Sequence, residues 1–368
     1  MGRNKDLLSN VQVVSLVASA IIGVTISTLP RTVVEDAGLN GVIGLVVGGV
    51  ISMLLTVLIA MLAGKFPDAV ILEYGRNLLG PIFSKVMITL WLVYFTALTG
   101  VVHRIFADAI KAFLLENTPI EIIILSMLVV TAYLAQNGIN PIARICEAFF
   151  PVIIGSIFIV LLLSLQNFNV KEFYSLGQIN VMDILKIIPI TVISYLGFEL
   201  LLFVSAFTIE PQKIMRNGLI GVGISLVTYT AAVVLSVGVF SVDSLKYQIY
   251  PMLELAKTIA FPGAFAERFD VFFAIFWILA VFTTVVIFYY LGAISLTKLV
   301  GLKNYRPFTY LFVPVIYVIS LLPQEVAQVN QFTTWVSYLG GSLVAVIPVL
   351  LLAVAFARKK GGSKSEDT

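Results

Sequence analysis

A carboxylate and a glycine lie two positions apart in the middle of a long apolar stretch. Glu199 follows Gly197 in the segment ISYLGFELLLF, and no other charged residue occurs between positions 187 and 209. A charge at the centre of a bilayer costs about 2.5–3.5 kcal/mol on insertion scales unless protein groups satisfy it. Glycine weakens a helix at the same point. This pair predicts a polar site inside a membrane-spanning helix.

Three chemical roles are open to Glu199. The carboxylate can face the ammonium group of a ligand. It can take up and release a proton, with a pKa that burial raises. It can also accept hydrogen bonds from backbone N–H groups that a break in the helix sets free, which is a structural role. The residue types alone do not choose among the three.

A second glycine and polar pair occupies the matching place in the first half of the chain. Gly23 and Thr25 lie in SAIIGVTISTLPR, 174 positions before Gly197 and Glu199. Each pair lies in the first of five consecutive apolar spans, and an odd number of spans inverts the second copy in the membrane. Interrupted helices at matching places in inverted halves indicate a transporter-type binding site. We therefore expect both helices to be broken there and to hold a small polar ligand.

Two adjacent threonines, Thr283 and Thr284, lie in the middle of the apolar segment WILAVFTTVVIFYYLG. Neighbouring residues of a helix point about 100° apart, so at most one of them faces a shared cavity directly. Threonines in membrane helices often donate to their own backbone instead. Both roles stay open for this pair.

The composition is that of a polytopic α-helical membrane protein. Hydrophobic residues make up 60% of the 368 positions, charged residues only 12%, and the mean hydropathy is +1.04. Apolar stretches of about 18 residues or more recur, which a soluble domain does not carry. We expect one transmembrane domain over residues 1–358, with repeats at about 11–165 and 186–357, and a disordered tail at 359–368. The ten predicted spans are roughly 11–30, 41–64, 84–112, 119–136, 142–165, 186–209, 216–240, 269–297, 308–323 and 333–357.

The charges between these spans predict the orientation. Lys and Arg are about twice as frequent on the side that carries both chain ends as on the other, which places both termini in the cytoplasm. Two longer connections, 166–185 and 241–268, fall on the outer side. The second contains YPMLELAKTIAF, which is apolar at helical spacing and predicts a short interfacial helix.

The third span ends in charged residues. Arg104 lies about twenty residues after the start of the span, which places it near the outer interface. Asp108 follows four positions later on the same helical face, so an ion pair is expected. Snorkelling of both side chains to the interface is the alternative.

The sequence offers little support for a metal site or a catalytic site. The chain has one histidine, His103, and one cysteine, Cys146, so we expect no metal site, no cofactor and no catalytic set. The net charge of +3 gives no reason to expect a nucleic-acid partner. We therefore expect a protein that is not an enzyme.

Five segments in order along the chain resemble the B subunits of GerA-type spore germinant receptors, the spore germination permeases. They are GVTISTLPR, AFLLENTPIEIII, SYLGFELLLF, ERFDVFF and FTTVVIFYY. The similarity extends over about residues 7–358. That family lies within the amino acid–polyamine–organocation superfamily, so the resemblance implies a LeuT-like fold of five plus five inverted spans with helices 1 and 6 broken.

The resemblance also implies a function and a site. Such subunits sense a small nutrient, commonly an amino acid, in the spore inner membrane, together with an A-type membrane subunit and a C-type lipoprotein. Superfamily pockets are lined by spans one, three, six and eight. Members of the superfamily usually show G-x-G at the break in span one. Here the three residues are Gly23, Val24 and Thr25, and the threonine in place of the second glycine puts an α-amino acid ligand in doubt. The ligand-binding positions implied here are Gly23, Thr25, Leu98, Leu196, Gly197, Phe198, Glu199, Thr283 and Thr284.

Two other functions remain as alternatives. One is an ion-coupled amino acid transporter that works alone, although no lysine occurs in the fifth span, where some proton-coupled relatives carry one. The other is a scaffold subunit whose pocket is vestigial.

Overall fold

The computed structural model describes residues 7–177, 179–259 and 269–358, and its regular structure is helical apart from a single bridge between Leu8 and Thr208. The predicted tail at 359–368 lies outside the described residues. The α-helices are α1 Asn10–Ala37, α2 Asn40–Lys65, α3 Ile71–Leu79, α4 Pro81–Phe113, α5 Ile120–Ala135, α6 Ile139–Ser164, α7 Val181–Ser194, α8 Leu201–Val204, α9 Ile214–Leu245, α10 Pro251–Lys257, α11 Phe269–Val300, α12 Arg306–Leu321 and α13 Val326–Ala357.

The helices agree with a multi-pass membrane protein. Within the described ranges, seven are long and apolar enough to cross a bilayer, and α7 forms an eighth candidate with the segment Phe198–Phe207, bent by 48°. The helices α5 and α12 are apolar but shorter. These elements coincide in position with the ten predicted spans, so the predicted number is compatible with the structure.

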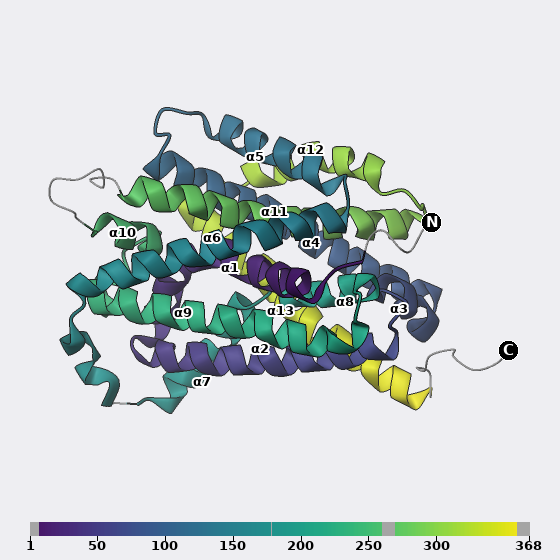
Figure 1. Ribbon diagram of the computed structural model, residues 1–368, viewed down its shortest axis with the longest axis horizontal. Coiled ribbons are helices and arrows are strands. Elements are labelled where there is room, and N and C mark those ends of the chain that lie inside the picture. The colour runs from purple at the N-terminus through teal and green to yellow at the C-terminus, as the bar shows by residue number, and fades with distance from the viewer. Residues whose placement is uncertain (1–6, 178, 260–268, 359–368) are drawn as a thin grey trace.

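Helix α1 occupies the centre of the bundle (Figure 1). In its most apolar window 83% of the residues are buried, against 39% for α2. It packs along α9, while α7 packs along α2, and α4 packs along α11. In Figure 1 the pairs α5 with α12 and α2 with α7 lie at opposite edges. The first helix of each predicted repeat therefore packs against the second helix of the other, as an inverted repeat requires.

The sixth span is broken at the predicted glycine. Helix α7 ends at Ser194, and Gly197 has φ +139°, a conformation that residues with a side chain rarely adopt. A Cβ at Gly197 would lie 2.9 Å from backbone atoms of Ala20 and Ile21 in α1. The break thus brings the sixth span into direct backbone contact with the first.

The expected break in the first span is absent, because α1 runs without interruption through Gly23. Hydroxyl groups from two other helices reach its central carbonyl groups instead. The Tyr229 hydroxyl donates to the carbonyl of Ile21 at 2.6 Å, and the Thr284 hydroxyl donates to the carbonyl of Ser19 at 2.6 Å. The helix therefore gains polar partners at its centre without unwinding.

Gly23 has a packing role in this arrangement. A Cβ there would lie 1.8 Å from Thr284 Oγ1 and 2.7 Å from the carbonyl oxygen of Ala280. The glycine lets α1 and α11 approach closely, as small residues commonly do in membrane helices.

Two short helices connect spans at equivalent places in the two predicted repeats. Helix α3 lies between the second and third spans and α10 between the seventh and eighth. Helix α10 falls within the predicted interfacial segment, but Met252, Leu253 and Leu255 are buried against other helices, α1 and α11 among them. The expected helix is present, and its apolar residues pack inside the protein rather than on a lipid surface. Residues 260 and 261 of the predicted segment, and the rest of that connection to 268, lie outside the described residues.

Candidate functional site

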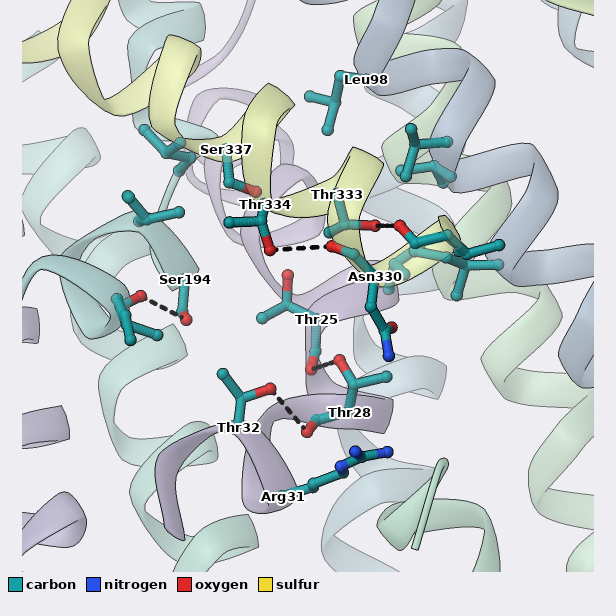
Figure 2. A pocket seen from close by; sticks show the side chains of 18 of the residues that line it. Thr25, Thr28, Arg31, Thr32, Leu98, Ser194, Asn330, Thr333, Thr334 and Ser337 are labelled. Atoms are coloured by element: carbon teal, nitrogen blue, oxygen red, sulfur yellow. Dashed lines mark hydrogen bonds between the residues drawn. The ribbon is translucent and has the colours of Figure 1, made fainter. Parts of the chain in front are cut away.

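A cavity of about 450 Å³ lies beside the break in the sixth span. Its walls come from α1, α4, α7 with the break, α11 and α13, and Figure 2 shows 18 of the lining side chains. The volume is within the range of small-molecule sites. The uncharged polar lining residues include Thr25, Thr28, Thr32, Tyr94, Ser194, Thr284, Thr333, Thr334 and Ser337.

The predicted site residues fall into three groups. Thr25, Leu98, Leu196 and Thr284 line this cavity. Gly23 and Thr283 instead border a separate small void between α1, α6 and α11. Gly197, Phe198 and Glu199 are buried at the break and do not belong to the cavity lining.

The two adjacent threonines of α11 have different surroundings. The Thr284 hydroxyl contacts the carbonyl of Ser19 in α1, and Thr284 lines the cavity. The Thr283 hydroxyl donates to the carbonyl of Ala280 in its own helix, at 2.8 Å. Of the two, the structure therefore places Thr284 at the cavity.

Glu199 is fully buried behind the cavity wall. Its Oε1 accepts a hydrogen bond from the Tyr94 hydroxyl at 3.0 Å, and its Oε2 accepts one from the Gly197 N–H at 2.6 Å. Tyr94 itself lines the cavity. The carboxylate therefore binds a backbone group at the break, and a phenol links it to the cavity.

Charged residues gather at one end of the cavity, which we call the mouth. Glu35 and Asp36 are exposed there, and Arg31 pairs with Glu35 at 3.4 Å. These residues belong to the last turns of α1. The mouth therefore opens at the end of the molecule where α1 terminates.

The predicted ion pair of the third span also lies at the mouth. Arg104 Nε is 3.0 Å from an Asp108 oxygen, and Asp108 lines the cavity. Arg104 is only 7% exposed, and its guanidinium also donates to the carbonyl groups of Pro323 and Gln324. The pair is confirmed, but the arginine fastens α4 to the α12–α13 connection instead of snorkelling.

At the opposite end of the molecule, the residues around the beginning of α1 bind the end of the broken span. The backbone N–H of Leu8 donates to Phe207 at 2.6 Å, and the Ile209 N–H donates to Leu8 at 3.0 Å. The Asn10 side chain donates to Glu210 and accepts from Asn217. We call this set of contacts the latch. It joins the beginning of α1 to the end of the broken span.

Sequence reasoning missed the wall that α13 contributes. Asn330, Thr333, Thr334 and Ser337 line the cavity at the spacing of one helical face. Asn330 lies before the predicted start of the tenth span at 333. The helical spacing of these polar residues at the beginning of an apolar span is the signal that could have found them.

A helical membrane bundle with a central helix, a broken span and a polar cavity beside the break defines a protein of solute-transporter architecture. The fold is similar to a crystal structure of MhsT in complex with L-phenylalanine, with a TM-score of 0.72, 11% identity, and coverage of 96% of this chain and 90% of that one. It is also similar to Mhp1, a nucleobase-cation-symport-1 family transporter, with a TM-score of 0.64, 14% identity, and coverage of 96% and 80%. These likenesses support the LeuT-like fold.

The sequence narrows this class to one family. Residues 7–329 match the model of the family described as spore germination protein, and the chain belongs to that family. It is 27% identical to spore germination protein YndE of Bacillus subtilis, over 96% of this chain and 98% of the relative. It is 28% identical to spore germination protein A2 of the same organism, over 96% of each. The relatives therefore place the chain among proteins of spore germination.

Proposed function

We propose that this chain is the germinant-sensing subunit of a spore nutrient receptor. It binds a small nutrient, an amino acid in the first instance, in the cavity and signals to partner subunits. The observation that carries the proposal is the polar cavity beside the broken span, in a chain that belongs to a germination family. The partners would be an A-type membrane subunit and a C-type lipoprotein. The location would be the spore inner membrane with both termini cytoplasmic.

The site would work by binding and not by covalent catalysis. The polar groups beside the break include the hydroxyls of Thr25, Ser194 and Thr284, and α7 ends next to them at Ser194. The partial negative charge of a helix C-terminus would favour the ammonium group of an amino acid. Thr25 and Thr284 would contact the ligand from either side, with Leu98 and Leu196 packing against its side chain.

The signal would be a shift between two arrangements of the helices. In the structure charged residues line the mouth at one end of the cavity, and the latch contacts hold the other end of α1 to the broken span. A ligand moves such an equilibrium only if it binds one arrangement better than the other. Contacts between α1, the broken span and α13 are the ones that a ligand in the cavity would change.

Transport assays test this proposal against the transporter alternative. The purified chain would be reconstituted into liposomes with proton and sodium gradients and given labelled amino acids. We expect binding without accumulation in the absence of partner subunits. Robust gradient-driven uptake by the chain alone would favour the independent transporter and contradict the receptor proposal.

A further inference from the structure

Two basic side chains lie where α2 and α13 end beside each other, at the end of the molecule opposite the mouth (Figure 1). The Lys65 ammonium group, in the last turn of α2, lies 3.8 Å from the centre of the Phe356 ring, in the last turn of α13. Arg358 is exposed and follows Phe356 by two residues, which corresponds to about 3 Å along the helix. We call these three residues the basic corner.

No carboxylate of the described chain forms an ion pair with the basic corner. Neither α2 nor α13 contains an Asp or Glu residue. Helix α3 packs against α13, but its acidic residue Glu73 is paired with Lys298 at 2.7 Å. The Phe356 ring is the partner that the structure gives to Lys65, and a ring at an exposed site attracts an ammonium group only weakly. The positive charge of the corner therefore stays available to an anion.

Exposed apolar side chains continue from the basic corner along both helices. On α2, Met61 and Leu54 precede Lys65 by four and eleven residues, which places all three on one helical face. On α13, Val349 precedes Phe356 by seven residues and shares its face. Met61, Leu54 and Val349 are 42–61% exposed. In a bilayer these two faces would contact acyl chains.

This combination of charge and apolar faces indicates the chemistry of the ligand. A soluble anion would use the two cations alone. A phospholipid with a net negative headgroup would use both features, with its phosphate at Lys65 and Arg358 and its acyl chains along α2 and α13. Lys and Arg residues at the cytoplasmic ends of membrane helices attract such headgroups. A zwitterionic lipid would instead bring a further positive charge toward the two cations.

We propose that the basic corner is a binding site for an anionic phospholipid that bridges α2 and α13. The inference does not rest on the proposed nutrient sensing, because none of the three residues lines the cavity. It has a consequence for the cavity nevertheless, since the first half of α13 forms part of the cavity wall. A lipid held at the corner would fix the other end of that helix.

Native mass spectrometry of the purified full chain in detergent tests the proposal. The probes are dioleoylphosphatidylglycerol, which is anionic, and dioleoylphosphatidylcholine, which is zwitterionic and has the same acyl chains. We expect the first molecule of the anionic lipid to bind at least about tenfold more tightly than the first molecule of the zwitterionic one. Equal affinities would overturn the site.

Two matched double variants locate the binding. Lys65→Gln with Arg358→Gln should lower the affinity for phosphatidylglycerol at least about tenfold and change that for phosphatidylcholine less than about twofold. The control is Lys303→Gln with Arg306→Gln, which removes the same charge from exposed positions at the junction of α11 and α12. It should change both affinities less than about twofold. Equal losses in the two double variants would show a general effect of charge and would overturn the site.

A cross-linking measurement on the unchanged sequence keeps the test independent of the variants' folding. Phosphatidylglycerol with a diazirine in one acyl chain would be photolysed with the chain in phosphatidylcholine nanodiscs. We expect labels on α2 around Met61 and on α13 around Val349, suppressed by excess unlabelled phosphatidylglycerol. Labels spread evenly over other lipid-facing helices such as α5 and α12 would contradict a defined site.

A further arm separates the phospholipid from a soluble anion. Glycerol phosphate carries the phosphate of the headgroup without acyl chains, so it should not displace phosphatidylglycerol at equal concentration. Displacement by glycerol phosphate would assign the corner to a soluble anion and overturn the phospholipid site. Each of these results leaves the proposed nutrient sensing untouched, because that function is tested by amino acid binding in the cavity.

Discussion

The hydroxyl of Tyr94 donates to the carboxylate of Glu199 across 3.0 Å, and this bond joins the third span to the break in the sixth. The other carboxylate oxygen holds the N–H of Gly197. These contacts favour the structural role among the three that the sequence leaves open for Glu199. They also show that the Tyr94 side chain contacts both the cavity and the break. A ligand that displaced the phenol would loosen the break directly.

Removing either partner of this bond should destabilise the protein. Tyr94→Phe deletes one hydrogen bond to the carboxylate and should cost about 1.5–3 kcal/mol. Glu199→Gln keeps one acceptor but turns an N–H₂ group toward a donor, and we expect a cost of about 1–3 kcal/mol. Thermal unfolding in detergent measures both. A melting temperature unchanged in both variants would show that the pair does not hold the break.

A side chain at Gly197 should be tolerated poorly. Gly197→Ala forces a residue with a Cβ into φ +139° and against the backbone of Ala20, so a loss of at least about 2 kcal/mol is expected. Gly155→Ala is the control, because a Cβ there meets nothing within 4 Å. Yield of folded protein by size-exclusion chromatography reports the difference. Equal yields would mean that the break can form without glycine.

The two threonines of α11 should differ in function. Thr284→Val removes the hydroxyl that reaches Ser19 of α1 and borders the cavity, whereas Thr283→Val removes a bond within one helix. We expect the concentration of nutrient for half-maximal germination to rise at least about fivefold for Thr284→Val and less than about twofold for Thr283→Val. The opposite ranking would place the ligand at the small void beside Gly23.

The latch should weaken in acid. Hydrogen bonds from Lys213 and then Asn10 hold the pKa of Glu210 below its ordinary value of 4.5. A depressed pKa in the folded state means that the carboxylate stabilises the latch above about pH 4.5. This contribution disappears as the pH falls below that value, through the folded pKa.

Spin labels can follow this change, because Val11 and Ile209 are both exposed beside the latch. With Val11→Cys and Ile209→Cys labelled, the distance distribution should be narrow at pH 7 and should widen as the pH falls below 4.5. Adding Glu210→Gln should give the wide distribution at both pH values. A distribution that stays narrow throughout would show that Glu210 does not hold the latch.

The sequence predicts the parts of this fold that depend on local chemistry. Hydropathy locates the spans, and a glycine beside a buried carboxylate locates the break at Gly197. The continuity of α1 could not be predicted in the same way. The polar partners of its centre, the hydroxyls of Tyr229 and Thr284, lie more than 200 positions from Ile21 and Ser19. A glycine that allows close packing and a glycine that allows a break look the same in a sequence.

The α13 wall shows a second limit. Asn330 and Thr334 lie where a hydropathy profile places the polar edge of a span, so composition alone assigns them to the membrane surface. In the structure α13 packs against α4 and lies across the cavity from α1. This packing places the polar residues of α13 in the cavity wall. The Arg104 contacts with Pro323 and Gln324 fix this end of α13 beside the mouth.

Filling the cavity tests the central claim most directly. Leu98→Trp places a large ring in the cavity from α4, whereas Leu90→Trp on the same helix faces outward and is the control. Both would be introduced into spores in which this chain is the sole B-type subunit, and protein levels would be matched by immunoblotting. The account predicts that Leu98→Trp abolishes the nutrient dose response while Leu90→Trp keeps it. An unchanged dose response in Leu98→Trp spores, with normal protein level, would contradict nutrient sensing in this cavity.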